Sequence, residues 1–153
     1  MCDSLDRVDV DVEARVRRSF ARQGYMATIG AELVHVAAGE VDIALPFNAR
    51  LTQQDGYLHA GVVAGAADSA CGYAALTTMD TGAEVLTVEF KINLLAPAAG
   101  ERLVARGRVL RTGRTLTVCR GDAVTINGGR EKHVATLTAT LIAIVQSPSE
   151  IPS

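Results

Sequence analysis

The sequence contains no tryptophan, and aromatic residues make up only 4% of its 153 residues. Hydrophobic residues nevertheless make up 48% of the chain, so its core must be aliphatic, built mainly from Val, Leu, Ile and Ala. This length is close to the common size of one domain. We therefore expect a single domain over residues 1–153, with a tail of about 147–153 that frays.

An excess of basic charge is also missing. The formal net charge is −2, which argues against a nucleic-acid partner, because such proteins usually carry a strongly basic face. Apolar runs are too short to span a bilayer. The first residues, MCDSLDRVDVDVEARVRR, are acidic and lack the apolar region of a secretory signal, so a cytoplasmic protein without a membrane partner is expected.

Cysteine is scarce, and its spacing excludes the usual cysteine chemistry. Cys2, Cys71 and Cys119 are far apart, odd in number and form no CxxC pair. A disulfide framework or a structural zinc site is therefore not expected. We interpret these cysteines as reduced, small core residues, and we expect no metal and no cofactor.

Periodicity predicts helices and strands in a definite order. Apolar residues at helical spacing predict a helix over 12–23 that ends at Gly24. Residues 31–38 and 40–47 are rich in Val, Leu and Ile and predict two strands joined tightly. Residues 59–79 lack strand alternation and are rich in alanine, which predicts a long helix.

Four further strands follow this helix. They are predicted over 84–96, 101–112, 114–126 and 133–146, with turn residues between them. Tight links favour an antiparallel meander. A nearly uncharged helix must be covered on most sides, so we expect an α+β fold in which a curved antiparallel sheet of about six strands wraps the helix.

One side of the predicted long helix combines glycines with a single carboxylate. Gly61, Gly65, Asp68 and Gly72 fall in a narrow stripe at ~100° per residue. Each glycine costs roughly 1 kcal/mol of helix stability relative to alanine. The stripe therefore predicts that a second helix or a thin ligand approaches the backbone there.

Asp68 has two interpretations. It could bond a nearby hydroxyl, such as that of Ser69 or Thr87, and only fix the packing. Alternatively, it is a carboxylate held at a dry cleft, where burial tunes its pKa for chemistry. Burial of an unpaired carboxylate is costly, so either interpretation requires a partner or access to water.

The start of the helix offers a complementary group. The free N–H groups near Ala60 and Gly61 carry the positive end of the helix dipole and can hold a developing oxyanion. Asp68 lies eight residues further on, ~12 Å along the axis at 1.5 Å per residue. The two groups cannot meet within one helix, so we expect a site shared across a dimer.

At this point a family resemblance is visible. The segments LHAGVVAGAADSACGYAA, LTVEFKINLLAPA and GERLVARGRVLRTGRTLTVCRGD resemble the hotdog-fold acyl-CoA thioesterases of the phenylacetate-degradation (PaaI-like) type. The resemblance covers roughly residues 25–145. It implies a long helix wrapped by an antiparallel sheet, a homodimer and often a homotetramer formed as a dimer of dimers.

The resemblance also implies roles for individual residues. Asp68 matches the general base or nucleophile, and Ala60 matches the backbone N–H that binds the oxyanion. His59 matches the histidine that sets the loop or contacts the thioester. Gln53 matches the amide that positions water or the carbonyl, and Thr87 matches the hydroxyl that orients the water. This chain departs from the family at Ala60, where glycine is common, and at Gln53, where asparagine is common.

Coenzyme A carries phosphates, so basic groups are expected at the mouth of the cleft. Arg111 and Arg114 flank a predicted turn and are our candidates for these contacts, although solvated hairpin charges would look the same. Gly61 and Asn93 are further candidates for substrate binding.

These observations predict an enzyme that hydrolyses an acyl-CoA thioester to free acid and CoA. One alternative is a hotdog-fold acyl-thioester hydratase or dehydratase, but that chemistry generally uses a histidine with a carboxylate, and no histidine shares the stripe of Asp68. The other is a non-catalytic acyl-CoA binding module, which would not need Asp68. The sequence does not distinguish aryl from short or medium alkyl acyl groups.

Overall fold

The computed structural model describes residues 10–145, so the predicted frayed tail lies outside the described part. The helices and strands follow one another in the order α1 (Val10–Ala21), α2 (Gly24–Thr28), β1 (Glu32–Ala37), β2 (Glu40–Pro46), the 3₁₀ helix η1 (Ala49–Leu51), α3 (Ala60–Leu76), β3 (Ala83–Leu94), β4 (Arg102–Thr112), β5 (Leu116–Asn127) and β6 (Arg130–Val145). The predicted fold is confirmed. One local prediction is wrong: Gly24 does not end a helix but begins α2, which the sequence analysis missed.

The six strands form one antiparallel sheet in the order β1-β2-β4-β5-β6-β3. Only β4, β5 and β6 follow one another as the predicted meander. The expected tight link between β3 and β4 is wrong, because β3 pairs with β6 at the far edge of the sheet. The two neighbours of β4 are β2 and β5. The segment that contains Pro97 and Gly100 therefore passes β6 and β5 to connect the edge strand β3 to β4 in the interior of the sheet.

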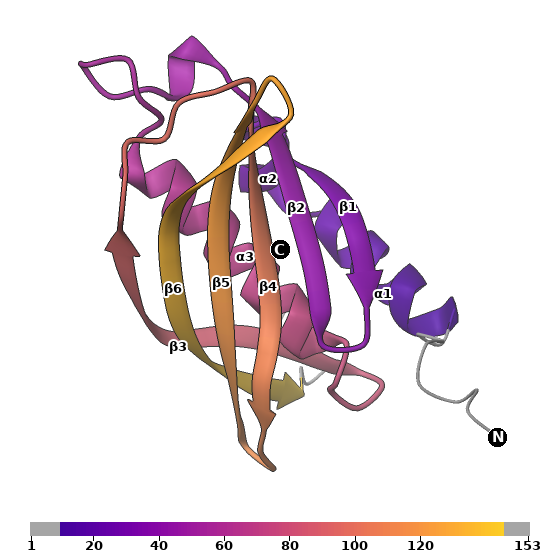
Figure 1. Ribbon diagram of the computed structural model, residues 1–153. Coiled ribbons are helices and arrows are strands. Elements are labelled where there is room, and N and C mark those ends of the chain that lie inside the picture. Colours follow the sequence, from indigo (N-terminus) through magenta and orange to yellow (C-terminus); the bar gives the residue numbers. More distant parts are fainter. Residues whose placement is uncertain (1–9, 146–153) are drawn as a thin grey trace, which may run out of the picture.

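Helix α3 packs against the inner face of the sheet, with α1 and α2 at its side near β1 (Figure 1). The contact is closest at two glycines that are paired across β4 and β5, Gly107 and Gly121. A Cβ atom at Gly107 would lie 2.2 Å from the Ala70 carbonyl oxygen of α3. A Cβ at Gly121 would lie 2.9 Å from Cys71 Sγ. These glycines let the helix backbone rest directly on the sheet.

The core between helix and sheet is aliphatic, as the composition predicts. Its largest fully buried side chains include Met26, Ile43, Leu45, Leu103, Leu137 and Leu141. Cys71 and Cys119 are free thiols with no exposed surface, which confirms the prediction of small core residues for these two; Cys2 lies outside the described residues. Within 10–145, no helix is long and apolar enough to cross a membrane.

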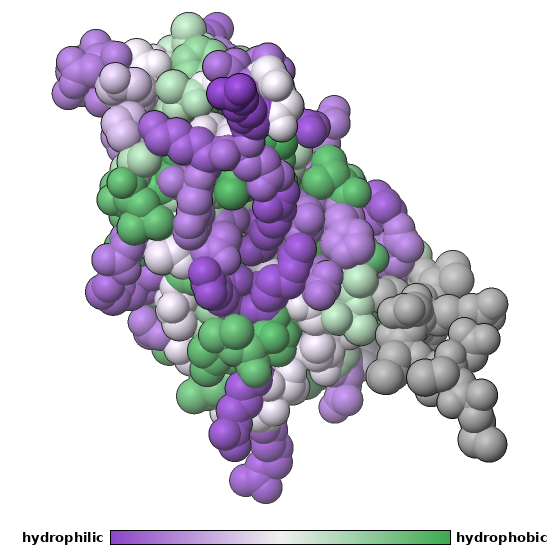
Figure 2. All heavy atoms as spheres, viewed as in Figure 1, coloured by the Kyte–Doolittle hydropathy of each residue, from purple (hydrophilic) through white to green (hydrophobic). Residues whose placement is uncertain are grey.

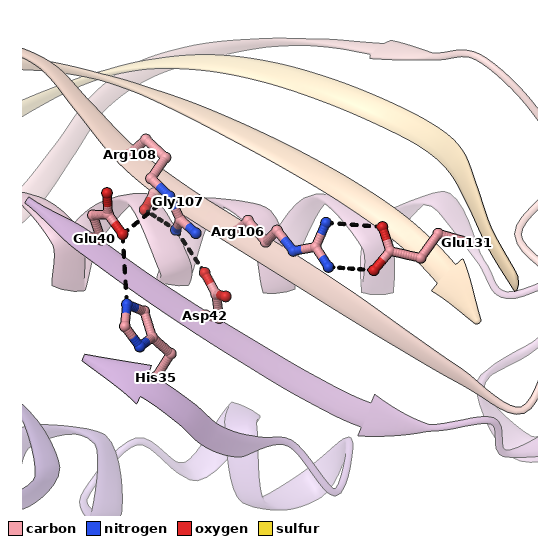
Figure 3. Close-up of polar contacts among 7 residues, drawn as sticks. All are labelled: His35, Glu40, Asp42, Arg106, Gly107, Arg108 and Glu131. Carbon is pink, nitrogen blue, oxygen red and sulfur yellow. Dashed lines mark hydrogen bonds and ion pairs between the residues drawn. The ribbon is translucent and has the colours of Figure 1, made fainter. Parts of the chain in front are cut away.

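The outer face of the sheet carries ion pairs between neighbouring strands. Arg108 contacts Asp42 at 2.5 Å and Glu40 at 3.6 Å, and Arg106 forms a two-bond pair with Glu131 (Figure 3). Hydrophilic side chains dominate the centre of this face (Figure 2). Around these ion pairs, charged outward positions such as Asp42 and Arg106 alternate with buried inward ones such as Val41 and Ala105, so burial fixes the register of the sheet.

Candidate active site

Helix α3 begins at a residue whose amide has no partner. The side chain of His59 caps the helix: its Nδ1 accepts a 2.8 Å hydrogen bond from the Gly61 N–H. The N–H groups of Val62 and Val63 bind the His59 carbonyl oxygen, at 2.9 and 3.3 Å. Among the hydrogen bonds of residues 10–145, none is donated by the Ala60 N–H. Ala60 is an exposed residue, and its amide therefore remains free at the positive end of the helix dipole.

The loop before α3 is anchored to the segment that follows β3. The Leu58 N–H donates to the Ala98 carbonyl oxygen at 2.9 Å. Within the loop, the Gln53 Oε1 atom accepts the backbone N–H of Asp55, and its Nε2 lies 3.4 Å from Asp55 Oδ2. The Gln53 amide is thus bonded to its own turn, although Gln53 and Ala60 border the same cavity.

This cavity has a volume of about 390 Å³ and lies beside the start of α3. Its walls come from the loop before the helix, the helix itself, the end of β3 with the segment after it, and β6. Its lining includes Tyr57, Leu58, Val63, Leu95, Pro97 and Val134. The free amide of Ala60 is therefore placed at the wall of a mostly apolar chamber.

Asp68 lies further along α3 and is half-buried. Its Oδ1 accepts a 2.8 Å hydrogen bond from Thr87 Oγ1 on β3, whereas the hydroxyl of Ser69 donates instead to Gln23 Oε1 at 3.0 Å. Burial raises the pKa of the Asp68 carboxyl above its ordinary value of 3.8, and the bond from Thr87 opposes that rise. The carboxylate thus combines restricted solvation with a single hydroxyl partner.

Asp68 and Ala60 do not meet within the chain. They are eight residues apart on one helix, so ~12 Å of helix axis separates them. The Thr87 hydroxyl is hydrogen-bonded to Asp68, whereas Gln53 and His59 lie near Ala60 at the start of the helix. One chain therefore carries an acid and an electropositive amide at two separate places.

The glycine stripe of α3 is approached by the chain itself. A Cβ at Gly65 would lie 2.6 Å from Tyr25 Cε1 of α2, and one at Gly72 would lie 3.7 Å from Leu141 Cδ2 of β6. The Tyr25 hydroxyl also donates to the Gly61 carbonyl oxygen at 3.3 Å. The expected close approach by a second helix is thus met at Gly65, where the group comes from α2, but it is wrong at Gly72, where a side chain of the sheet lies at ordinary contact distance.

The other predicted residues lie apart from both Ala60 and Asp68. Asn93 faces the outer side of the sheet, where its Oδ1 accepts a 2.7 Å bond from Lys91 Nζ. Arg111 is exposed and pairs with Val118 in the sheet register. Arg114 borders a second cavity of about 360 Å³ at the other end of α3, together with several threonines such as Thr78.

Sequence reasoning missed two parts of this region. Tyr25 lies on α2, a helix of 5 residues that is too short for a clear periodic pattern. The cavity wall formed by Leu94, Leu95 and Pro97 was interpreted as the end of a strand and a turn. A signal existed, because two consecutive leucines at the end of a strand cannot both face the core of an alternating sheet.

A long helix held on the inner face of a six-stranded antiparallel sheet defines the class as a hotdog-fold domain. The sequence profile of the Thioesterase superfamily matches residues 55–132, a range that includes the start of α3, Asp68 and Thr87. The chain belongs to the Thioesterase superfamily.

Known structures support this assignment. A thioesterase family protein from Silicibacter pomeroyi is 50% identical, with a TM-score of 0.86 over 88% of this chain and 99% of that chain. The PaaI protein of the phenylacetic acid degradation operon of E. coli shares the fold, with a TM-score of 0.80 over 90% of this chain and 96% of that one, at 19% identity. A curated relative from Saccharolobus solfataricus, provisionally named an esterase, is 33% identical over 59% of this chain and 64% of its own length.

Proposed function

We propose that the protein hydrolyses an acyl-CoA thioester to a free acid and CoA, with each reaction centre shared by two subunits of a homodimer. The observation that carries the proposal is the pair of half-sites on α3. The Ala60 N–H is free at the wall of a cavity, and Asp68 is held by Thr87 ~12 Å further along the same helix.

In this proposal the thioester carbonyl oxygen accepts the Ala60 N–H of one subunit. Negative charge develops on that oxygen when the carbonyl carbon is attacked, and the amide at the helix start stabilises it. A donor of this kind contributes ~10²–10³-fold to the rate. His59 keeps this first turn in place by capping Gly61, and Gln53 lies close enough to border the same chamber.

Asp68 of the partner subunit supplies the base or the nucleophile. As a base, it takes a proton from water, the resulting hydroxide attacks the carbonyl carbon, and the C–S bond breaks to release CoA as the thiolate, which then takes up a proton. As a nucleophile, it forms a mixed anhydride with the acyl group and releases CoA, and water then cleaves the anhydride. Thr87 orients the carboxylate in both routes, and general-base help contributes ~10²–10⁴-fold.

The edge of the sheet supports the dimer. β3 is an edge strand, and its hydrophobic side chains Leu86, Val88 and Phe90 are between 42 and 56% exposed. An exposed hydrophobic edge strand is a ready template for another strand. A second copy would pair through a two-fold axis, so the two β3 strands would run antiparallel and bring the two α3 helices together. A dimer of dimers remains a prediction.

The same pairing suggests where CoA phosphates bind. Antiparallel β3 strands bring the Ala83 end of one subunit beside the Leu94 end of its partner. The cavity that Arg114 borders lies at the Ala83 end, and the cavity of Ala60 lies at the Leu94 end. We therefore assign Arg114, with Arg111 nearby, to the CoA phosphates of a substrate whose thioester lies at the partner's start of α3. Such a substrate fits the expected cytoplasmic location.

Subunit mixing tests this proposal. Asp68→Asn removes the carboxylate, and Ala60→Pro removes the amide hydrogen. Proline is well tolerated at the first helical position, and His59 before it has the φ of −60° and ψ of 139° that proline requires. Ala60→Gly, which keeps the N–H, is the matched control and should retain activity.

Each variant alone should lose activity, by ~10²-fold or more. When both are co-expressed in equal amounts, random pairing should restore about a quarter of wild-type turnover, because that fraction of sites receives both intact groups. If the mixed dimers recover no activity, Ala60 and Asp68 of different subunits do not act together, and a shared site is refuted. Unchanged turnover of Asp68→Asn would reject catalysis by this carboxylate, and tight acyl-CoA binding without turnover by the wild type would favour a binding module.

A further inference from the structure

The cavity at the start of α3 is the larger of the two chambers described above, and its chemistry limits what can enter it. Its walls are aliphatic side chains: Leu58, Val63, Leu95, Pro97, Ala98 and Val134. Leu58, Val63, Ala98 and Val134 are buried, so this part of the wall belongs to the core, whereas Leu94 and Leu95 are more than half exposed. The buried part of the chamber is therefore set by the fold itself.

Polar groups are few in this chamber. None of its lining residues carries a formal charge, and the polar side chains among them are those of Gln53 and Tyr57. The amide oxygen of Gln53 is already bonded to the backbone N–H of Asp55. A ligand carboxylate that entered the chamber would lose its water without gaining a cation, which is strongly unfavourable.

The size of the chamber sets a second limit. An engineered cavity of ~150 Å³ is large enough to hold benzene. The chamber beside Ala60 measures about 390 Å³, more than twice that volume. A short acyl group such as acetyl would leave most of it empty, and a single phenyl ring would fill less than half of it.

We infer that this chamber receives the acyl group, and that the substrates are CoA thioesters of uncharged, mainly aliphatic acids of medium length. This inference rests on the proposed thioester hydrolysis, because it places the carbonyl at the Ala60 N–H and the chain beyond it in the chamber. Each methylene that is buried there raises kcat/KM by up to about fourfold. The chamber excludes succinyl and malonyl thioesters because their free carboxylate would lose its water there without gaining a cation.

Leu95 offers a way to change the chamber without disturbing the core. It lies on the chamber wall and is 53% exposed, so Leu95→Trp narrows the space while the buried walls stay intact. Leu110 on β4 is 60% exposed and is not part of the chamber, so Leu110→Trp is the matched control. Thiol release would be measured with acetyl-, octanoyl-, phenylacetyl- and succinyl-CoA.

For the wild type, we expect octanoyl-CoA to exceed acetyl-CoA and succinyl-CoA in kcat/KM by about tenfold or more. Leu95→Trp should lower the value for octanoyl-CoA by about tenfold and leave acetyl-CoA nearly unchanged, while Leu110→Trp changes neither. An equal loss for all chain lengths would mean that the chamber holds the CoA arm and would overturn the inference. A preference for succinyl-CoA would overturn it as well.

A binding measurement separates this inference from the proposed function. Calorimetry with the Asp68→Asn variant should show tighter binding of octanoyl-CoA than of succinyl-CoA, and Leu95→Trp in that background should abolish the difference. If the wild type hydrolyses no thioester but this binding pattern holds, the proposed hydrolysis fails and the assignment of the chamber stands. Equal binding of both thioesters would refute the chamber assignment whatever the turnover.

Discussion

Thr87 Oγ1 donates a 2.8 Å hydrogen bond to Asp68 Oδ1 and links β3, at the edge of the sheet, to the middle of α3. Thr87 stands next to a β-bulge that separates it from Glu89 in the pairing with β6. An extra residue in a strand re-aims the neighbouring side chains. The bulge thus belongs to the geometry that turns this hydroxyl toward the carboxylate.

Loss of the Thr87 hydroxyl should shift the pH dependence of catalysis. The hydrogen bond favours the ionised form of Asp68 and opposes the rise in pKa that burial causes. Thr87→Val removes that opposition, so the acid limb of the kcat profile should move to higher pH. Thr87→Ser keeps the hydroxyl and should leave the limb where it is in the wild type. A parallel loss of rate at every pH would instead indicate that Thr87 acts on water and not on the ionisation of Asp68.

Asp68→Asn should make the protein more stable at neutral pH while it removes activity. Because burial raises the pKa of Asp68 in the folded state above 3.8, the folded protein binds this proton more tightly than the unfolded chain. Stability from this group is fully present below pH 3.8 and is lost as the pH rises through the folded pKa. The variant should therefore show a higher denaturation midpoint than wild type at pH 7 and a smaller difference at pH 3.5. A lower midpoint at pH 7 would contradict the pKa direction.

Gly107→Ala should destabilise the fold severely. The added Cβ would lie 2.2 Å from the Ala70 carbonyl oxygen and 2.7 Å from the Cys71 nitrogen, both of them backbone atoms of α3 that cannot move alone. We expect a loss of about 3 kcal/mol in the free energy of unfolding. Gly24→Ala, where a Cβ meets nothing within 4 Å, should change it by less than ~0.5 kcal/mol. Guanidinium titration of both variants measures the difference.

The two core cysteines should be unreactive until the protein unfolds. Burial raises the pKa of the Cys119 thiol to about 12, and burial chiefly raises that of Cys71 as well. Little thiolate is therefore available for alkylation. In a Cys2→Ser background, a thiol reagent at pH 8 should label neither cysteine in buffer and both in guanidinium. Rapid labelling of the native protein would show that the contact between α3 and β5 opens readily.

The sequence predicts the helix that carries the candidate site better than it predicts the surroundings of that helix. The uncharged, alanine-rich run and its lone carboxylate identify α3 and Asp68, and the N–H groups at its start follow from helix geometry alone. The strand order does not follow, because turn residues such as Pro97 and Gly100 show where a strand ends but not which neighbour it pairs with. Only the complete sheet decides that β3 lies at an edge.

The sequence also failed to predict which glycines allow the closest packing. The sequence analysis assigned close backbone approach to the glycines of α3, yet the tightest approach is at Gly107 of the sheet. Glycine inside a strand is itself a signal of close backbone approach. At Gly65 the neighbouring group is the Tyr25 ring from a short helix that no periodic pattern announces.

The separation of Ala60 from Asp68 along one helix makes the proposed enzyme sensitive to its own abundance. A folded monomer keeps both the Ala60 N–H and the Asp68 carboxylate, but they are too far apart to act on one thioester. The monomer should therefore be inactive. Specific activity should therefore fall when the protein is diluted below the dissociation constant of the dimer and recover when it is concentrated again. In a cell, turnover would then rise more steeply than the amount of protein, which is a form of control that needs no effector.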